Sequence, residues 1–163
     1  MTAPERLVAM LVDWLPAQRW FAGKEWPIAG IRVLAHNPLE GEPPIPLGNR
    51  IIEVPEFPER TEMMRDPRGG FVAYAPVGSL ARGEALVTTG ASKTVQCSVC
   101  HGQDNMGLGP IPGIAGRTAS YIMRQLWDMK QGTRASPLMA PVIANLTQDE
   151  MLAISAYIAS LSP

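Results

Sequence analysis

Cysteine and histidine are scarce in this sequence of 163 residues, which has two of each. A structural zinc site needs four ligands, and His36 and His101 lie far apart in the sequence, which argues against such a site. The formal net charge is only −1, so nothing indicates a nucleic-acid-binding protein. No apolar run approaches the roughly 20 residues needed to cross a bilayer, and we predict no transmembrane segment.

The opening residues also lack the features of a secretory signal. There is no basic n-region, Asp13 interrupts the apolar stretch, and no small-residue cleavage site follows. Apolar residues at helical spacing predict a helix that ends before Pro16, and residues 28–34 then predict a short strand.

Both cysteines fall in one motif, Cys97-Ser98-Val99-Cys100-His101. Two cysteines three apart, followed at once by histidine, form the attachment site of a c-type haem. Each thiol can add to one vinyl group of the porphyrin, and His101 then points its imidazole at the iron from the proximal side. The alternatives are half of a zinc site or a redox Cys-x-x-Cys pair, but the redox pair would need a βαβ setting that is absent. We therefore predict one covalently bound haem c with its iron.

Proline content divides the chain into three parts. Residues 1–34 form an N-terminal extension, residues 35–78 a Pro-rich strap, and residues 79–163 a haem domain. In the strap, the cluster at 43–46 and further prolines disfavour long helices, and residues 51–54 and 71–74 predict short extended segments. Apolar residues between the prolines indicate a strap packed on a core rather than a free linker.

Residues 79–163 predict three helices. Ser79 is the expected cap of the first helix, which Gly90 ends, and Thr118 is the expected cap of the second, which Gly132 ends. The third opens with a Thr-x-x-Glu capping box, Thr147 and Glu150. Its apolar stripe consists of Met151, Ile154, Tyr157, Ile158 and Leu161.

The order helix, Cys-x-x-Cys-His, proline-bearing loop, helix, methionine loop, helix resembles a class I cytochrome c of the small, mono-haem bacterial type. The resemblance covers residues 79–163, and its loop motif is Gly107-Leu108-Gly109-Pro110-Ile111-Pro112-Gly113-Ile114-Ala115-Gly116. It implies a mainly α fold with three main helices around the haem, preceded here by an irregular Pro-rich extension. It also implies that Gly83 meets Tyr157 where the first and last helices cross.

The same resemblance implies the iron ligands. His101 would bind iron through Nε2 while its Nδ1–H donates to the carbonyl of Pro112, with Pro110 as the second choice. Met139, in a proline-flanked loop, is the predicted sixth ligand, because bis-histidine ligation would need the distant His36. Met106 is too near the motif, and the other methionines nearby (Met123, Met129 and Met151) lie on helical patterns, where core packing is the default. Met139 as a core-filling side chain is the alternative. Trp127 is assigned to core packing.

A second resemblance concerns the N-terminal extension. The segment Trp14-Leu15-Pro16-Ala17-Gln18-Arg19-Trp20-Phe21-Ala22-Gly23-Lys24 resembles the N-terminal cap of bacterial maltokinases, over about the first 34 residues. No kinase catalytic loop, metal-binding Asp-Phe-Gly or phosphate-binding glycine loop follows, so we predict no kinase activity. A packing extension is favoured over an independent binding module.

These features together predict a function in electron transfer. The expected protein carries single electrons, as a soluble carrier or as the cytochrome subunit of a redox complex, and is not itself an enzyme. Its expected partners are a dehydrogenase, an oxidase or another cytochrome. The alternative is a haem enzyme or ligand sensor with an open or labile sixth position. Covalent haem implies a periplasmic location, in conflict with the missing export signal.

Overall fold

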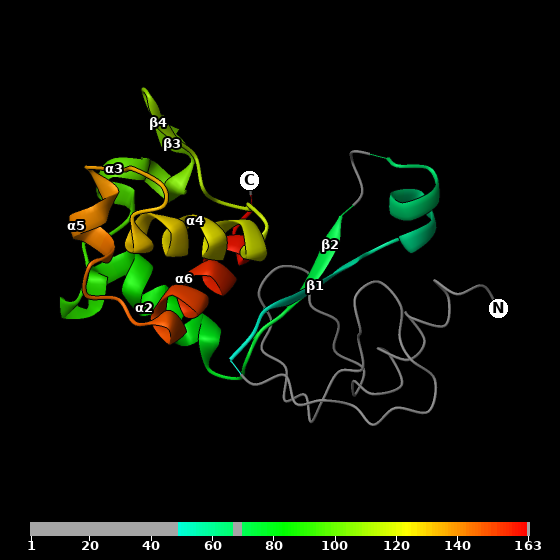
Figure 1. Ribbon diagram of the computed structural model, residues 1–163, viewed down its shortest axis with the longest axis horizontal. Coiled ribbons are helices and arrows are strands. Elements are labelled where there is room, and N and C mark those ends of the chain that lie inside the picture. Colours follow the sequence, from blue (N-terminus) through cyan, green and yellow to red (C-terminus); the bar gives the residue numbers. More distant parts are fainter. Residues whose placement is uncertain (1–48, 67–69, 163) are drawn as a thin grey trace.

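The computed structural model describes residues 49–66 and 70–162, and Figure 1 shows its ribbon. The predictions for residues 1–48, including the first helix and His36, lie outside this part. Along the described chain lie β1 (Ile52–Pro55), the single π-helical turn η1 (Glu59–Met63), β2 (Phe71–Tyr74), α2 (Ser79–Thr89), η2 (Gly90–Ser92), α3 (Ser98–His101), η3 (Gln103–Asn105), β3 (Gly107–Leu108), β4 (Ile111–Pro112), α4 (Ala119–Gln131), α5 (Met139–Ile143) and α6 (Gln148–Ser160). Within this part, no helix has the length and apolar character needed to cross a membrane.

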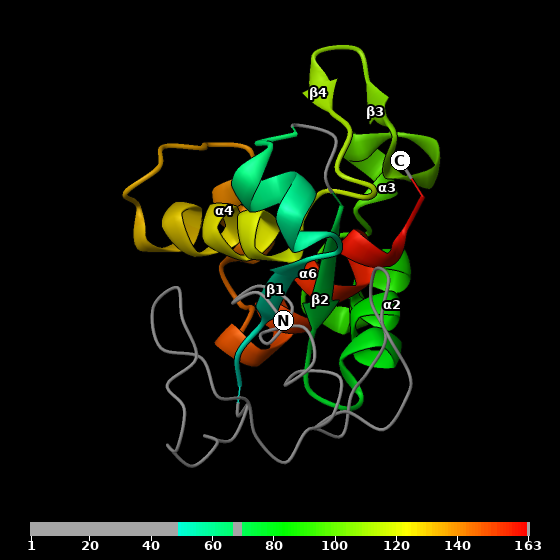
Figure 2. The ribbon, with the colours of Figure 1, turned by 90° about the vertical axis from the view of Figure 1, so that its right-hand side faces the viewer.

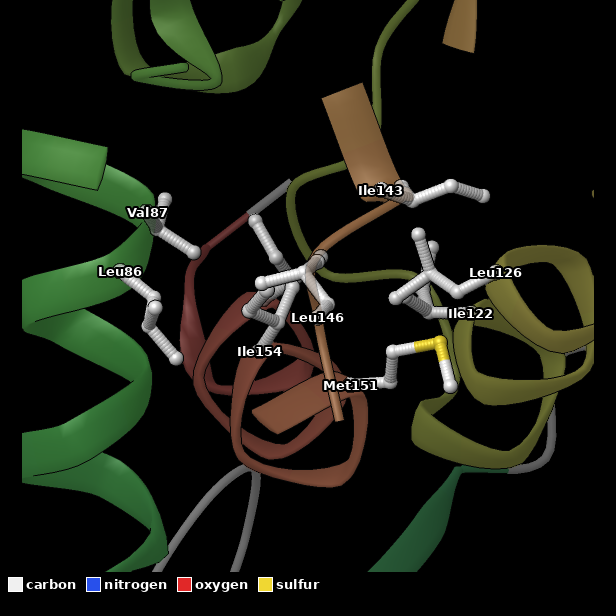
Figure 3. Close-up of a cluster of buried hydrophobic side chains, with 9 residues drawn as sticks. Leu86, Val87, Ile122, Leu126, Ile143, Leu146, Met151 and Ile154 are labelled. Atoms are coloured by element: carbon white, nitrogen blue, oxygen red, sulfur yellow. The ribbon is translucent and has the colours of Figure 1, made fainter. Parts of the chain in front are cut away.

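Helix α6 lies at the centre of the molecule. Helices α2 and α4 both pack against it, and every residue from Met151 to Ala156 is buried. Figure 3 shows how side chains from α2, α4 and α5 converge with Met151 and Ile154 of α6. The cluster consists of Leu86, Val87, Ile122, Leu126, Ile143, Leu146, Met151, Ile154 and Ile158. The prediction of three main helices is therefore confirmed.

The crossing of α2 and α6 depends on Gly83. A Cβ atom at Gly83 would lie 2.7 Å from Cβ of Tyr157 and closer still to the carbonyl oxygen of Ala153. Only a residue without a side chain lets the two backbones approach this closely. The predicted meeting of Gly83 with Tyr157 is confirmed, and it explains why glycine is kept inside a helix that it weakens.

Two helix starts differ from the sequence prediction. Ser79 was expected to cap α2, but it is the first helical residue, and the cap is Gly78 in the left-handed conformation (φ 88°). Thr118 does occupy the cap position of α4, yet its side chain makes no capping bond. Instead Glu53 caps α4 from β1: its Oε1 accepts from the Ala119 amide (2.6 Å), and its Oε2 accepts from the Ser120 hydroxyl. A carboxylate here also complements the positive end of the helix dipole.

The described part of the strap contains a short antiparallel hairpin. Strands β1 and β2 pair antiparallel, from Ile52 opposite Tyr74 to Pro55 opposite Phe71, in the two segments expected to be extended. Figure 2 looks onto this hairpin with α4 and α6 behind it. Ile51 packs against two small apolar clusters that join the hairpin to the helices: Ala73, Ala119 and Ala159 form one, and Ala75, Leu152 and Ala156 the other. The predicted packing of the strap on a core is confirmed for this part.

Glu150 is a buried carboxylate at the start of α6, only 2% exposed. The capping box is present as predicted: Thr147 N–H donates to Oε2 (2.8 Å), and Glu150 N–H donates to Oγ1 of Thr147 (3.3 Å). Lys93 Nζ (2.5 Å) and Arg82 (3.2 Å) both donate to Oε1. Burial by itself would raise the pKa of Glu150, but the bonds from Lys93, Thr147 and Arg82 outweigh it and lower the pKa to about 2.

Acid should therefore destabilise the fold through Glu150. Since its pKa is depressed in the folded state, its contribution is present above the unfolded value of 4.5 and is lost as the pH falls towards about 2. A shift of this size corresponds to at most about 3 kcal/mol, and the burial makes this an upper bound. We expect Glu150→Gln to lower the free energy of unfolding at pH 7, and the difference from the wild type to shrink between pH 4.5 and 2. Urea titrations at several pH values measure this, and the exposed Glu59→Gln is the control. An equal loss at pH 7 in both variants would contradict the assignment.

Candidate functional site

The sequence motif folds into a single helical turn. Helix α3 begins after Cys97, and the amide of His101 donates to the Cys97 carbonyl (2.9 Å). The amide of Cys97 donates to Val87 O (3.0 Å), which joins the turn to the end of α2. Cys97 is half-buried against the core cluster, whereas Cys100 is exposed. The turn therefore brings both thiols and the imidazole together on one short element.

A hydrogen bond orients the imidazole of His101. Its Nδ1 lies 2.8 Å from the carbonyl oxygen of Pro112 in β4. This geometry places the proton on Nδ1, which donates to the carbonyl and leaves the Nε2 lone pair available to a metal. Pro112, rather than Pro110, thus occupies the position that the resemblance implied.

The loop that carries Pro112 is held close to α3. A Cβ atom at Gly102 (φ 79°) would clash with the backbone of Gly107 in β3, so the loop can return this closely only at a glycine. The carbonyl of Asn105 accepts from the amides of Ile114 (2.8 Å) and Ala115 (3.1 Å). These contacts fix the short β3–β4 hairpin, which projects beside α3 in Figure 1.

The Cys97 thiol does not have the character of a reactive redox cysteine. Both are free thiols, and burial, followed by the neighbouring Cys100, raises the pKa of Cys97 to about 11. Reactive Cys-x-x-Cys pairs instead depend on a lowered thiol pKa. Among the residues that the structure describes, no group of three or more His, Cys, Asp or Glu side chains is arranged to hold a metal ion. Neither alternative reading of the motif gains support.

Met139 lies at the first position of α5, not in a loop as the sequence suggested. It is half-buried and packs against the same core cluster as Cys97. Met151 is fully buried inside the cluster, and Met106 is exposed. Met123 and Met129 of α4 also pack against the cluster, and Met123 contacts the residues beneath the hairpin as well.

Three further side chains either depart from the sequence predictions or were absent from them. Trp127, assigned to core packing, is 41% exposed, because its position on α4 faces away from α6 while Leu126 is buried. Thr94 and Lys130, which sequence reasoning missed, donate hydrogen bonds to backbone carbonyls around α5. The spacing of residues in the sequence cannot predict such bonds, because their acceptors are main-chain atoms.

Known proteins of similar sequence identify the family of this chain. The chain is 36% identical over 85 residues to cytochrome c-554(547) of Halothiobacillus neapolitanus, a match that covers 44% of this chain and 93% of that protein. The chain belongs to the cytochromes c. Its three packed helices are the cytochrome c helical fold, and the hairpin of β1 and β2 precedes them in the sequence.

Other cytochromes c also match about half of the chain. The cytochrome subunit of sulfide dehydrogenase from Chlorobaculum tepidum is 31% identical over 93 residues, covering 57% of this chain and 84% of that protein. Cytochrome c-552 of Acidithiobacillus ferridurans is 37% identical over 81 residues, covering 48% of this chain and 35% of that protein. The chain spans well under half the length of the latter. These relatives are named as a cytochrome and as the cytochrome subunit of a dehydrogenase.

A different family matches the N-terminal part. Residues 14–48 match the family described as "Maltokinase N-terminal cap domain", a stretch that starts and ends later in the chain than the sequence resemblance suggested. These residues lie outside the described part of the structure.

The described residues fit a haem c, the cofactor of the cytochromes c. Two thiols and an oriented imidazole supply the chemistry that covalent attachment and proximal ligation require. Half-buried apolar side chains on the same cluster provide a suitable surface for a porphyrin: Ile114, Met123, Met129, Met139 and Val142. The fit rests on the types of donor group that α3 and its cap bring together, which are the thiols of Cys97 and Cys100 and the imidazole of His101.

Proposed function

We propose that this cytochrome c is a one-electron carrier, or the electron-carrying subunit of a redox complex, with one haem bound to residues 79–163. The observation that carries the proposal is the turn of α3, where the oriented His101 stands beside two thiols. The 163 residues contain one Cys-x-x-Cys-His motif, which supports one haem for this chain. When bound, the haem supplies an iron that cycles between Fe(III) and Fe(II).

The cysteines act as nucleophiles in attachment. Each thiol adds across one vinyl group, so that a carbon–sulfur bond forms and the thiol hydrogen moves to the other vinyl carbon. No electrons are gained or lost overall. Cys97 and Cys100 would thereby fix the porphyrin to α3, and His101, whose ring orientation is set by Pro112, would supply Nε2 to the iron.

Met139 is our proposed sixth ligand. Its half-buried position on the cluster that also contacts Cys97 supports the proposal. Among the other described methionines, Met63, Met64 and Met106 are exposed, and Met151 is enclosed in the core. A thioether ligand favours the reduced iron, and a ligand on each side leaves no open position for a substrate.

Electrons enter and leave near the second thioether in this proposal. Cys100 is exposed, and its neighbour Val99 is 62% exposed, so a partner can approach this edge closely. Such redox contacts are small and brief. The partners would be a dehydrogenase, an oxidase or another cytochrome, and the name of the Chlorobaculum tepidum relative, a cytochrome subunit of sulfide dehydrogenase, supports the first of these. Because covalent haem is assembled outside the cytoplasm, we propose a periplasmic location.

Exposure to carbon monoxide tests the proposed function. The native ferrous protein should not bind carbon monoxide, since both axial positions are filled, and the ferric protein should show the red charge-transfer band of methionine-ligated haem. Iron analysis should give one iron per chain. Rapid binding of carbon monoxide would instead support a ligand sensor or haem enzyme with an open sixth position.

A further inference from the structure

Thr94 joins the segment before the haem motif to the helix that carries Met139. Its hydroxyl donates to the carbonyl oxygen of Val142 in α5 over 2.7 Å, and the side chain is half-buried. The amide of Thr94 donates to Gly90 O (3.0 Å), so the donor is itself anchored to the end of α2. The segment before the haem motif is thus connected to α5 by one side-chain hydrogen bond.

Lys130 binds the backbone just after the C-terminal end of α5. It lies in the last turn of α4, and its Nζ donates to the carbonyl oxygens of Ala144 (3.1 Å) and Leu146. These carbonyls directly follow α5. Carbonyls at a helix end have no partner within the helix, and a lysine ammonium satisfies them with charge-assisted bonds.

Helix α5 needs such support because it is very short. It has five residues, too few to be stable by helical hydrogen bonds alone. The preceding residues offer little packing, since Leu138 is 79% exposed and Pro137 is also exposed. Only Ile143 is fully buried. The orientation of Met139 therefore depends on what fixes the later part of α5.

We propose that Thr94 and Lys130 are positioning residues that hold α5 so that the Met139 thioether stays on the iron. The inference rests on the proposed His101/Met139 ligation. Thr94 acts through a backbone carbonyl of α5, and Lys130 acts through backbone carbonyls just after it. Loss of either donor leaves a carbonyl unpaired and lets α5 move, which weakens the methionine–iron bond without removing the ligand.

The test uses the holoprotein with Thr94→Val and Lys130→Met. Losing one such bond should raise the rate at which imidazole displaces methionine from ferric iron about tenfold. The red charge-transfer band should fade at a lower temperature than in the wild type, and the reduction potential should fall. Thr94→Ser, which keeps the hydroxyl, should restore wild-type behaviour.

Matched controls separate positioning from general stability. Thr88→Val removes a hydroxyl that also donates to a carbonyl over 2.7 Å, but within α2. Arg124→Met removes an exposed cation from α4, away from the carbonyls that Lys130 contacts. Both should exchange imidazole at the wild-type rate. If Thr94→Val and Lys130→Met match these controls, the positioning role is wrong, and should Thr94→Val fail to fold, Lys130→Met decides. If the wild type itself lacks the band, the proposed function fails instead.

Discussion

Met139→Ala is expected to abolish the red charge-transfer band of the ferric protein and to let the ferrous protein bind carbon monoxide. Alanine has no atom that can ligate iron, so the sixth position becomes open to exogenous ligands. The reduction potential should fall by on the order of 0.1 V, within the range of about 0.8 V that axial ligands span. Absorption spectra and a redox titration measure all three effects.

Met129→Ala is the matched control for this experiment. Met129 packs half-buried against the same core cluster, so its removal also trims a methionine from the surroundings of the site. We expect the band to persist in this variant and the carbon monoxide test to stay negative. If Met129→Ala loses the band while Met139→Ala keeps it, the ligand assignment is reversed and the electron-carrier proposal still holds.

Gly83→Ala should have the largest effect on the fold. The added methyl group would be forced against the Ala153 carbonyl and Tyr157, and a backbone oxygen in a central helix cannot move aside easily. Alanine is the better helix former by about 1 kcal/mol, which offsets part of the cost. We expect a net loss of roughly 2–4 kcal/mol in the free energy of unfolding, by overpacking. The midpoint of urea denaturation reports this.

Gly132→Ala serves as the comparison. Gly132 ends α4 at φ 77°, and nothing lies within 4 Å of a Cβ there, so its substitution costs only backbone strain, about 1–2 kcal/mol. The Gly83 variant should have the lower midpoint of the two. A Gly83→Ala protein as stable as the wild type would mean that α2 and α6 do not cross this closely.

Local signals in the sequence predicted most of the helices. The Thr147–Glu150 capping box marks the start of α6, and glycines mark the ends of α2 and α4. Each of these signals acts over three or four residues, which is why one sequence suffices to read them. The cap of α4 could not be read in this way, because its donor atoms bond to Glu53, 66 residues earlier.

The burial of α6 shows a second limit. The apolar stripe of Met151, Ile154 and Ile158 predicted one buried face, but Ser155 and Ala156 are buried as well. Small residues carry little hydrophobic signal, and Ala156 becomes buried because residues next to the β1–β2 hairpin, Ile51 and Ala75, pack against it. A tertiary contact of this kind does not change the hydrophobic periodicity of the helix sequence, so the sequence alone cannot reveal it.

The residues of the candidate site also divide into those that local sequence signals predict and those that only tertiary contacts reveal. Cys97, Cys100 and His101 are neighbours in sequence, so the motif itself places them together. Pro112 required a resemblance, and the structure puts its carbonyl beside the imidazole. Thr94 and Lys130 could not be found, because they act on carbonyls that any residue type could supply. The prediction of Met139 as ligand stays a prediction.

The central place of α6 has a consequence for the order in which the chain can fold. Its neighbours are made first, and the side-chain bonds that close the structure join residues as far apart as Asn49 and Asp149. Contacts of such long range form late and slow folding. Until residues 148–160 have been synthesised, α2, α4 and the hairpin have no common surface to pack on. Folding of residues 49–162 should therefore be a single cooperative event that follows the synthesis of α6.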